Sequence, residues 1–275
     1  MTRARHALLQ ADRAMGLSHA PRRREADPLD ASVPASLSEP APGVPALDLP
    51  IAERASAPAT PSGTARAIPA PVAHGGIAVR GVEALEALRQ RHDRECPHCT
   101  TATAHTQTVF GEGDPEARLM FIGEAPGETE DRLGRPFVGR AGEKLDEMIR
   151  AMGLGREQVY IANVLKSRPP ENRTPLQHEV DACGPYLIEQ ILTIRPEVIV
   201  TLGGPATKLV LATDVGITRL RGVWSEWRSP GGEASIPVMP TYHPAYLLRN
   251  YTPQTRGEMW SDLQAVMARL GLGRK

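Results

Sequence analysis

Three polar residues that could recognise or activate a ligand lie where apolar runs of the sequence end. Glu124 follows the run 119–122, and Asn163 and His243 come at the ends of two later runs. Short apolar runs that stop at glycine or proline are typical of buried parallel strands. Open α/β sheets bind ligands beyond the carboxyl ends of their strands, so the end of such a run is a candidate position for a ligand site.

The loop after the first run is unusually rich in glycine, proline and charged residues. Residues 123–142 contain five glycines, two prolines, four acidic residues and three arginines. A plain connection does not need so many residues with special backbone or charge, so we interpret this loop as one wall of the site. Phe137 lies inside it, next to Pro136. An ordinary core phenylalanine is less expected between a proline and a glycine-containing loop.

The three cysteines are spaced as metal ligands rather than as a disulfide framework. Cys96 and Cys99 form a Cys-x-x-Cys pair, and Cys183 lies in a predicted helix far along the chain. Two thiolates on one turn can reach one metal centre, and a third from a distant helix would tie the start of the domain to its core. The alternative is three unrelated thiols. A fourth ligand is not obvious, and the nearby candidates are His98, His105, Ser167 and His178.

Apolar periodicity predicts alternating strands and helices that must hold these residues in place. The expected strands are residues 118–122, 159–164, 198–202 and 236–241, and the expected helices are residues 81–94, 141–152, 174–194, 205–212 and 252–270. Such alternation produces a parallel sheet covered on both faces. We therefore predict an α/β fold, a three-layer α/β/α sandwich with a central parallel sheet of about four strands. Pro175 is expected in the first turn of the helix 174–194. The prolines of the strand 236–241 indicate that this strand lies at an edge of the sheet, or that the prolines lie near the end of the strand.

Composition divides the chain into two parts. Residues 1–75 contain no Phe, Tyr or Trp but 11 of the 26 prolines and 18 alanines, which leaves too little apolar surface to offset the entropy of ordering. We predict a disordered Ala/Pro-rich tail over residues 1–77 and one folded domain over residues 78–275. No apolar run is long enough for a secretory signal or a membrane span, so we expect a cytoplasmic protein. The net charge of zero does not indicate nucleic acid by itself, but arginines cluster around the loop 123–142.

Several motifs resemble the family 4 uracil-DNA glycosylases. They are Gly123-Glu124-Ala125-Pro126-Gly127, Glu130-Asp131, Gly134-Arg135-Pro136-Phe137-Val138-Gly139-Arg140-Ala141-Gly142, Tyr160-Ile161-Ala162-Asn163-Val164, Arg168-Pro169-Pro170-Glu171-Asn172-Arg173 and Thr241-Tyr242-His243-Pro244-Ala245-Tyr246-Leu247-Leu248-Arg249. The resemblance runs from about Cys96 to the C-terminus. It implies a DNA-repair enzyme that flips uracil out of DNA and hydrolyses its N-glycosidic bond, leaving an abasic site. The motifs place no lysine for a Schiff base, so we expect no lyase step.

The resemblance also implies roles for the pocket residues. Phe137 matches the aromatic residue that stacks under uracil, and Asn163 matches the residue that reads uracil O4 and N3–H with its amide. His243 matches the histidine that hydrogen-bonds uracil O2 as the bond breaks, and Glu124 matches an acidic residue that positions water or stabilises charge on the sugar. Ala125 stands where glycosylases with the GQDPY motif have Asp, so the group that activates the water stays open. The expected uracil-binding residues are Gly123, Glu124, Ala125, Phe137, Asn163 and His243, and the expected catalytic residues are Glu124 and His243.

The implied partner is uracil-containing DNA, single- or double-stranded, bound by a monomer. Leu247, Leu248 and Arg249 resemble the wedge that fills the space left by a flipped base, although two leucines could equally begin a buried turn. The expected DNA-binding residues are Arg140, Arg168, Arg173, Leu247, Leu248 and Arg249. The sequence does not indicate what the tail binds.

One position departs from the family pattern. The family holds a [4Fe–4S] cluster with four cysteines, of which Cys96, Cys99 and Cys183 match three, and Ser167 stands at the fourth. A serine oxygen is a harder ligand than a thiolate and binds such a cluster less readily. The outcomes are a [4Fe–4S] cluster with Ser167 or solvent on the fourth iron, a three-iron cluster, or no cluster. We expect a [4Fe–4S] cluster that is held more weakly.

Two other functions fit parts of the sequence. A non-catalytic DNA-binding relative would keep the fold, but the intact pocket residues argue against it. A metal-dependent nucleotide hydrolase would bind Mg²⁺ through Glu130 and Asp131, but their spacing provides no clear two-metal set. Some relatives bond covalently to uracil through a histidine in an inserted basic loop. The loop 167–175 has neither insert nor histidine, so we expect turnover.

Overall fold

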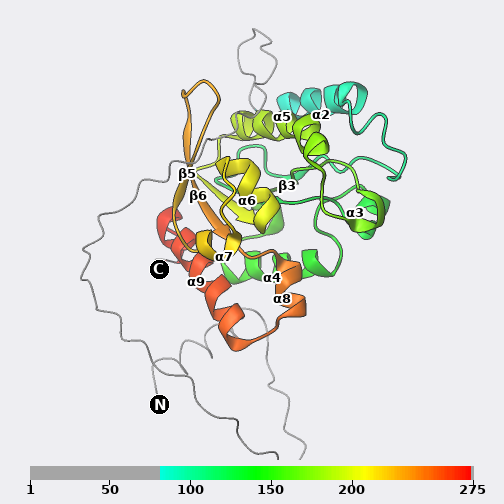
Figure 1. Ribbon diagram of the computed structural model, residues 1–275. Helices are drawn as coiled ribbons and strands as arrows, with labels where there is room; N and C mark the ends of the chain where they lie inside the picture. The colour runs from blue at the N-terminus through cyan, green and yellow to red at the C-terminus, as the bar shows by residue number, and fades with distance from the viewer. Residues whose placement is uncertain (1–80, 274–275) are drawn as a thin grey trace, which may run out of the picture. The chain divides into compact units, whose positions relative to one another are not determined.

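The computed structural model describes residues 81–273, and its centre is a six-stranded sheet (Figure 1). The strand order is β1-β3-β2-β4-β6-β5. The four inner strands run parallel and are β2 (Leu119–Gly123), β3 (Tyr160–Asn163), β4 (Val198–Leu202) and β6 (Ser235–Thr241). All four predicted strands are therefore confirmed, each to within one residue at its ends.

Two short antiparallel strands form the edges of the sheet, and the sequence analysis missed both. β1 (Glu112–Gly113) pairs with β3, and β5 (Ser225–Arg228) pairs with β6. Edge strands bury less of their surface, so they need no apolar run. In β5 the buried residue is Trp227, and its neighbours are polar.

The strand β6 lies between β4 and β5, so of the two expectations for its prolines the edge position is wrong, whereas Pro240 does lie near the end of the strand. Pro237 is in register with Glu226 of β5, and Pro240 is in register with Thr201 of β4. Each proline thus lies where β6 pairs in register with a single neighbour. The missing N–H groups therefore interrupt little of the hydrogen-bond ladder.

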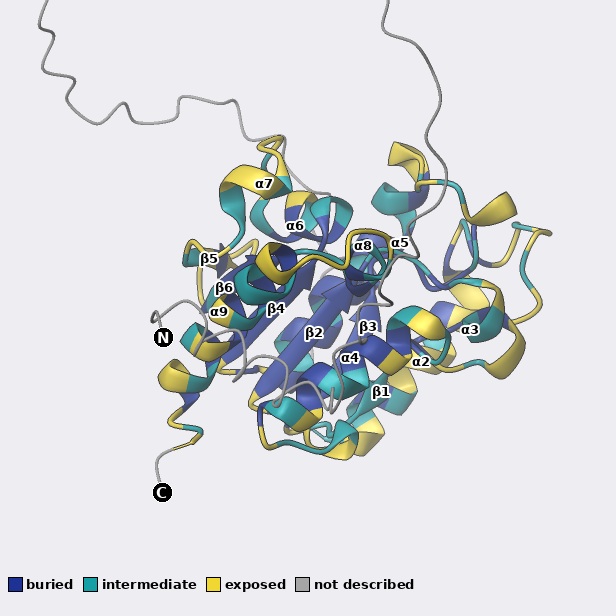
Figure 2. Cartoon of the chain, turned by 90° about the horizontal axis from the view of Figure 1, so that it is seen from below, coloured by how far each residue is buried: buried dark blue, intermediate teal, exposed yellow. Residues whose placement is uncertain are grey.

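Helices cover both faces of the sheet and give the three layers that the sequence predicts. Along β2, Met120 and Ile122 pack into one core, whereas Leu119 and Phe121 pack into the other. The first core is completed by α2 (Val82–Glu95), α5 (Gln177–Ile194) and α6 (Gly204–Leu211), and the second by α4 (Arg140–Ala151), α8 (Pro244–Arg249) and α9 (Pro253–Leu270). Figure 2 shows the parallel strands as a buried centre between these helices.

Shorter helical segments occupy the connections. They are α3 (Glu128–Leu133), η1 (Arg156–Gln158), η2 (Pro170–Asn172) and α7 (Ile217–Leu220). The sequence analysis did not predict them, nor α8, because a segment of one or two turns shows no helical periodicity. The predicted helices α2, α4, α6 and α9 are confirmed to within one residue.

The helix α5 begins later than the sequence predicts. Pro175 was expected in its first turn, but the helix begins at Gln177 with Leu176 as its N-cap. The Glu179 carboxylate accepts the Leu176 N–H at 2.7 Å and pairs with Arg173 at 2.7 Å. The Arg173 guanidinium lowers the pKa of Glu179 to about 2. These contacts fix the start of the helix, and Pro175 belongs to the preceding loop.

No helix in residues 81–273 is long and apolar enough to cross a membrane. The predicted tail over residues 1–77 lies outside the described residues. The domain boundary at residue 78 therefore stays a prediction.

Candidate active site

A cavity of about 400 Å³ opens at the carboxyl ends of β2, β3 and β6. The structure brings Glu124, Asn163 and His243 together on its wall, as the family resemblance implies. Phe137 and Ala125 from the loop 123–142 also line the cavity. The cavity therefore combines residues from three separate parts of the sequence.

The backbone around Phe137 fixes its ring on the cavity wall. Its φ is 51°, in the left-handed region that residues other than glycine rarely adopt. The Arg156 guanidinium donates to the carbonyl oxygens of Phe137, at 3.0 Å, and of Pro136. At Gly142 a Cβ would lie 1.9 Å from the Phe137 carbonyl oxygen, so only glycine lets α4 pass this closely. These contacts hold the strained conformation and set the direction of the ring.

Glu130 organises the start of α4 and does not form a metal site with its neighbour. Its Oε1 accepts the N–H groups of Val138 and Gly139 at 2.9 and 2.8 Å. Asp131 is buried and accepts the N–H groups of residues 106–107. Both carboxylates are thus engaged with backbone, which disfavours the metal-dependent nucleotide hydrolase.

The Asn163 amide lies on the cavity wall with an unpaired oxygen. The residue is 1% exposed, and its Oδ1 has no hydrogen-bond partner in the described part of the chain. Gly123 is its register partner on β2, where a Cβ would lie 2.4 Å from Asn163 Oδ1 and 2.4 Å from the Phe137 ring. An unpaired buried acceptor is costly, so this oxygen is a candidate contact for a ligand that donates a hydrogen bond.

The His243 ring is held as a neutral imidazole with a defined tautomer. Its Nδ1 accepts the N–H of Ala245 at 3.1 Å at the start of α8, so Nε2 carries the proton. Burial, assisted by the charge of Arg249, lowers the pKa of His243 to about 4. The ring stacks against Phe137 with a centroid distance of 5.5 Å and an interplanar angle of 30°. The site therefore offers a neutral N–H donor at neutral pH.

Glu124 is half-buried in the same cavity, directly after β2. Burial raises the pKa of its carboxyl group. Its backbone oxygen accepts the Leu165 N–H at 3.1 Å, which ties it to the loop after β3. Within residues 81–273 its carboxylate forms no hydrogen bond or ion pair. This carboxylate is therefore free to contact a ligand or water.

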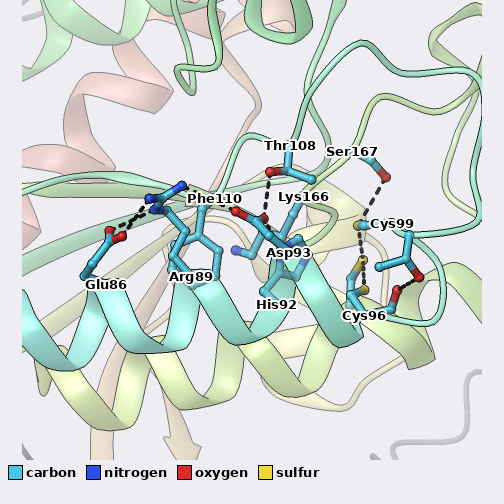
Figure 3. Close-up of polar contacts among 12 residues, drawn as sticks. Glu86, Arg89, His92, Asp93, Cys96, Cys99, Thr108, Phe110, Lys166 and Ser167 are labelled. Atoms are coloured by element: carbon cyan, nitrogen blue, oxygen red, sulfur yellow. Dashed lines mark hydrogen bonds and ion pairs between the residues drawn. The ribbon is translucent and has the colours of Figure 1, made fainter.

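The three cysteines converge in the core where the turn after α2 meets α5, as a shared metal site requires, and Figure 3 shows Cys96 and Cys99 of this group. Cys183 Sγ lies 3.6 Å from Cys96 Sγ and 3.4 Å from Cys99 Sγ. Ser167 Oγ lies 3.4 Å from Cys99 Sγ. Lone buried thiols would not gather in this way, so the arrangement favours a metal centre over three unrelated cysteines.

His92 is a fourth candidate ligand that the sequence analysis missed. The donor atoms of His92, Cys96, Cys99 and Cys183 all lie within 4.8 Å of one another, and all four residues are buried. The group does not include the three histidines proposed from the sequence, which are His98, His105 and His178. A histidine one helical turn before a Cys-x-x-Cys pair is the signal that could have found it.

Comparison with known proteins decides the family. A model of the uracil DNA glycosylase superfamily matches residues 110–264. A type-4 uracil-DNA glycosylase of Thermotoga maritima is 45% identical over 183 residues, which cover 66% of this chain and 92% of that relative. This chain belongs to the type-4 uracil-DNA glycosylases. The similar proteins of Sulfurisphaera tokodaii (46% over 176 residues, 62% of this chain and 78% of the relative) and Archaeoglobus fulgidus (43% over 180 residues, 64% and 88%) have the same type-4 description. The predicted family is confirmed.

In this type-4 uracil-DNA glycosylase, two of the four arginines expected to bind DNA line the cavity. Arg173 and Arg249 line the cavity, and Arg140 is exposed at the first residue of α4. Arg168 lies 3.5 Å from the Glu128 carboxylate. Because Arg173 and Arg249 belong to different segments, their common location could not be read from spacing alone.

One expected wedge residue is not at the surface. Leu247 is 0% exposed and packs in the core with α4 and α9, because α8 turns that side inward. This corrects the expectation that both leucines project toward DNA, and the buried-turn alternative describes Leu247. Leu248 is partly exposed and Arg249 is exposed.

Several residues that support the uracil-DNA glycosylase pocket have no motif that identifies them. Lys166 is fully buried, and its Nζ donates to the backbone oxygen of Asn163 at 2.7 Å and to Gln190 Oε1 at 2.6 Å. Asp262 of α9 accepts the Thr241 hydroxyl at 2.7 Å, which fixes the end of β6 two residues before His243. A charged residue on the apolar face of a predicted helix would have been the signal for Asp262.

Proposed function

We propose that this enzyme binds uracil flipped out of DNA in the cavity and hydrolyses its N-glycosidic bond, which leaves an abasic site for base-excision repair. The observation that supports this most strongly is the buried, unpaired oxygen of Asn163 beside the Phe137 ring. Uracil presents a flat face for the ring and an N3–H donor for that oxygen. Membership of the type-4 uracil-DNA glycosylases and the chemistry of the cavity therefore both support uracil as the bound base.

We propose that Asn163 selects the base through its Watson–Crick edge. The amide oxygen accepts from uracil N3–H, and the amide nitrogen donates to O4. Cytosine reverses this pattern, with an acceptor at N3 and donors at N4. Binding cytosine would leave the buried oxygen unpaired, a penalty of about 1–3 kcal/mol, and would face two donors toward each other.

His243 is proposed to stabilise the leaving uracil. As the N-glycosidic bond lengthens, negative charge develops on uracil O2, and a fixed N–H donor then binds more strongly than in the ground state. Nε2 is that donor, because Nδ1 is occupied by the Ala245 N–H. The lowered pKa keeps the ring neutral, so it donates a hydrogen bond without transferring a proton at neutral pH.

Glu124 is proposed to act on the sugar side of the bond. An ionised carboxylate stabilises the positive charge that develops on the deoxyribose and orients the attacking water. A general-base role would also use this group, because Ala125 has no ionisable side chain. The half-buried position and the absence of an ion partner in the described residues support Glu124 for this role.

The DNA backbone is proposed to bind across the mouth of the cavity. Arg140, Arg168, Arg173 and Arg249 provide positive charge for phosphates, and Leu248 is proposed to fill the space that the base leaves. Single- and double-stranded DNA are both proposed substrates of a monomer in the cytoplasm. None of the described cavity-lining residues is a lysine, which supports hydrolysis without a lyase step.

We propose that Cys96, Cys99 and Cys183 hold a metal centre that joins α2 and its following turn to α5. The family resemblance favours a [4Fe–4S] cluster. The sulfur separations of 3.4 and 3.6 Å favour a single tetrahedral ion such as Zn²⁺, because thiolates about 2.3 Å from one ion lie about 3.8 Å apart. In either form the bound centre supplies a structural cross-link, and the catalytic steps belong to the cavity residues.

The proposed function is tested with DNA oligonucleotides that contain one uracil, as single strands and opposite guanine or adenine. After incubation, abasic sites are cleaved chemically and the fragments are separated. We expect cleavage at uracil only, and intact DNA if the chemical step is omitted. Uncleaved uracil DNA beside an active positive-control glycosylase would end the enzyme proposal.

A further inference from the structure

His92 lies where a missing metal ligand is needed. It is in the last turn of α2, four residues before Cys96, so the two side chains project from the same side of the helix (Figure 3). Its donor nitrogen lies within 4.8 Å of the sulfur atoms of Cys96, Cys99 and Cys183. Three thiolates and one imidazole form a common four-ligand set for tetrahedral metal sites.

The His92 ring has one nitrogen engaged and the other available. Nδ1 lies 3.0 Å from the Asp93 carboxylate, which also accepts the Thr108 hydroxyl at 2.8 Å. Nε2 is buried and has no hydrogen-bond partner among the described residues. Ligand histidines typically have this arrangement, with the distal nitrogen on a carboxylate and the other nitrogen on the metal.

The surroundings of His92 fix the plane of its ring. The ring is 0% exposed and packs edge-on against Tyr186, with a centroid distance of 4.9 Å, and against Phe110 at 5.6 Å. A buried histidine with an orphaned nitrogen is expensive unless something pairs with that nitrogen. The packing leaves the group of three thiols as its neighbours.

Ser167 is the competing fourth ligand, and its chemistry is weaker. A hydroxyl must lose a proton with a very high pKa before it becomes a strong ligand, whereas a neutral imidazole binds metal directly. The Ser167 hydroxyl lies 3.4 Å from Cys99 Sγ, a distance that suits a hydrogen bond to a ligand sulfur. Ser167 then supports a thiolate instead of binding the metal.

We propose that His92 is the fourth ligand of the metal centre and replaces the thiolate missing at Ser167. The donor set of this chain is therefore Cys96, Cys99, Cys183 and His92. The inference rests on the metal centre proposed above and does not depend on whether its occupant is iron–sulfur or zinc.

The first test measures iron, acid-labile sulfide and zinc per chain in full-length protein purified without oxygen. The variants are His92→Ala, Ser167→Ala as the matched control, and His92→Cys, which restores a ligand of the family type. After dialysis against a chelator, we expect the metal content per chain of His92→Ala to be at least about tenfold lower than that of wild type. Ser167→Ala and His92→Cys should keep the wild-type metal content. Loss in Ser167→Ala with full retention in His92→Ala would overturn the proposal.

A second measurement on wild-type protein covers the case in which His92→Ala does not fold. X-ray absorption at the edge of the bound metal should show the outer-shell scattering of an imidazole, with three sulfur ligands if the metal is a single ion and on one iron of four if it is a cluster. The imidazole signal should disappear in His92→Cys. Zinc with an imidazole supports His92 and rejects the iron–sulfur cluster, whereas iron and sulfide without an imidazole reject His92 and support the cluster. Metal-free, folded wild-type protein overturns both proposals.

Discussion

Single residues of the cavity are held by one polar contact and keep a second position free for a ligand. His243 uses Nδ1 for the Ala245 N–H and leaves Nε2, and Asn163 leaves its buried Oδ1 unpaired. Leaving such groups unpaired costs folding energy, which a ligand with the complementary pattern returns on binding. The hydrogen bonds that are made thus specify which hydrogen bonds the ligand must make.

Substitution of His243 tests the donor role. We expect His243→Ala to lower the single-turnover rate of uracil release by about 100- to 1,000-fold, with a smaller effect on DNA affinity, because the contact strengthens as charge develops. His178→Ala, at an exposed position of α5, is the matched control and should retain the wild-type rate. An equal loss of affinity and rate would instead indicate a binding role.

The raised pKa of Glu124 predicts opposite effects on activity and stability. Wild-type activity should rise with pH as the carboxyl ionises above its ordinary value of 4.5, and Glu124→Gln should lack this acid limb. Because burial raises the pKa, ionisation costs folding energy at pH values above the raised pKa, and that cost disappears below about 4.5. Glu124→Gln should therefore melt at a higher temperature than wild type at neutral pH, and the difference should vanish in acid. Identical pH profiles and melting temperatures would contradict this account.

At the scale of helices and strands, α4 is the element that sets the position of Phe137. A Cβ at Gly142 would meet the Phe137 carbonyl oxygen at 1.9 Å, whereas a Cβ at Gly257 of α9 would have nothing within 4 Å. Gly142→Ala should lower the melting temperature and weaken uracil excision together. Gly257→Ala should leave activity unchanged and stabilise the protein by about 0.5–1 kcal/mol. Equal behaviour of the two variants in thermal unfolding and excision assays would show that α4 does not constrain the ring.

Much of the element pattern could be predicted from sequence because the elements are buried and periodic. All five residues of β2 are buried, so its apolar run was visible. β1 and β5 were missed because edge strands need few apolar residues, and the start of α5 was misplaced because Glu179 and Arg173 fix it through side chains. Such tertiary contacts leave no periodic signal.

At the scale of the whole domain, the proposed metal centre would connect the segment around α2 to α5. Cys96 and Cys99 follow α2, whereas Cys183 belongs to α5. Removal of the metal should therefore loosen α2 and leave α9 unaffected. Hydrogen exchange of the chelated protein should show faster exchange in residues 82–95 and unchanged exchange in residues 253–270. Uniform loss of protection would mean that the centre holds the whole fold.

The site was predictable where motifs mark it and not where packing alone creates it. Asn163 and His243 could be placed together because both match motifs of the family 4 uracil-DNA glycosylases. His92 was missed although its position one helical turn before Cys96 was a signal. Lys166 had no signal, since its role depends on the contacts with Asn163 and Gln190 that the fold creates. Leu247 was expected at the surface because the sequence of α8 does not reveal which side of this helix faces α4.

The most direct test of the account measures the free base released from matched DNA duplexes that contain uracil or cytosine opposite guanine. Wild-type protein should release uracil and no cytosine. Asn163→Asp should release uracil at least about 100-fold more slowly, because the carboxylate lacks the donor for O4, and should gain weak cytosine release. Two results would contradict recognition of the base by Asn163. One is uracil release by Asn163→Asp at the same rate as by the wild-type protein, and the other is cytosine release by the wild-type protein.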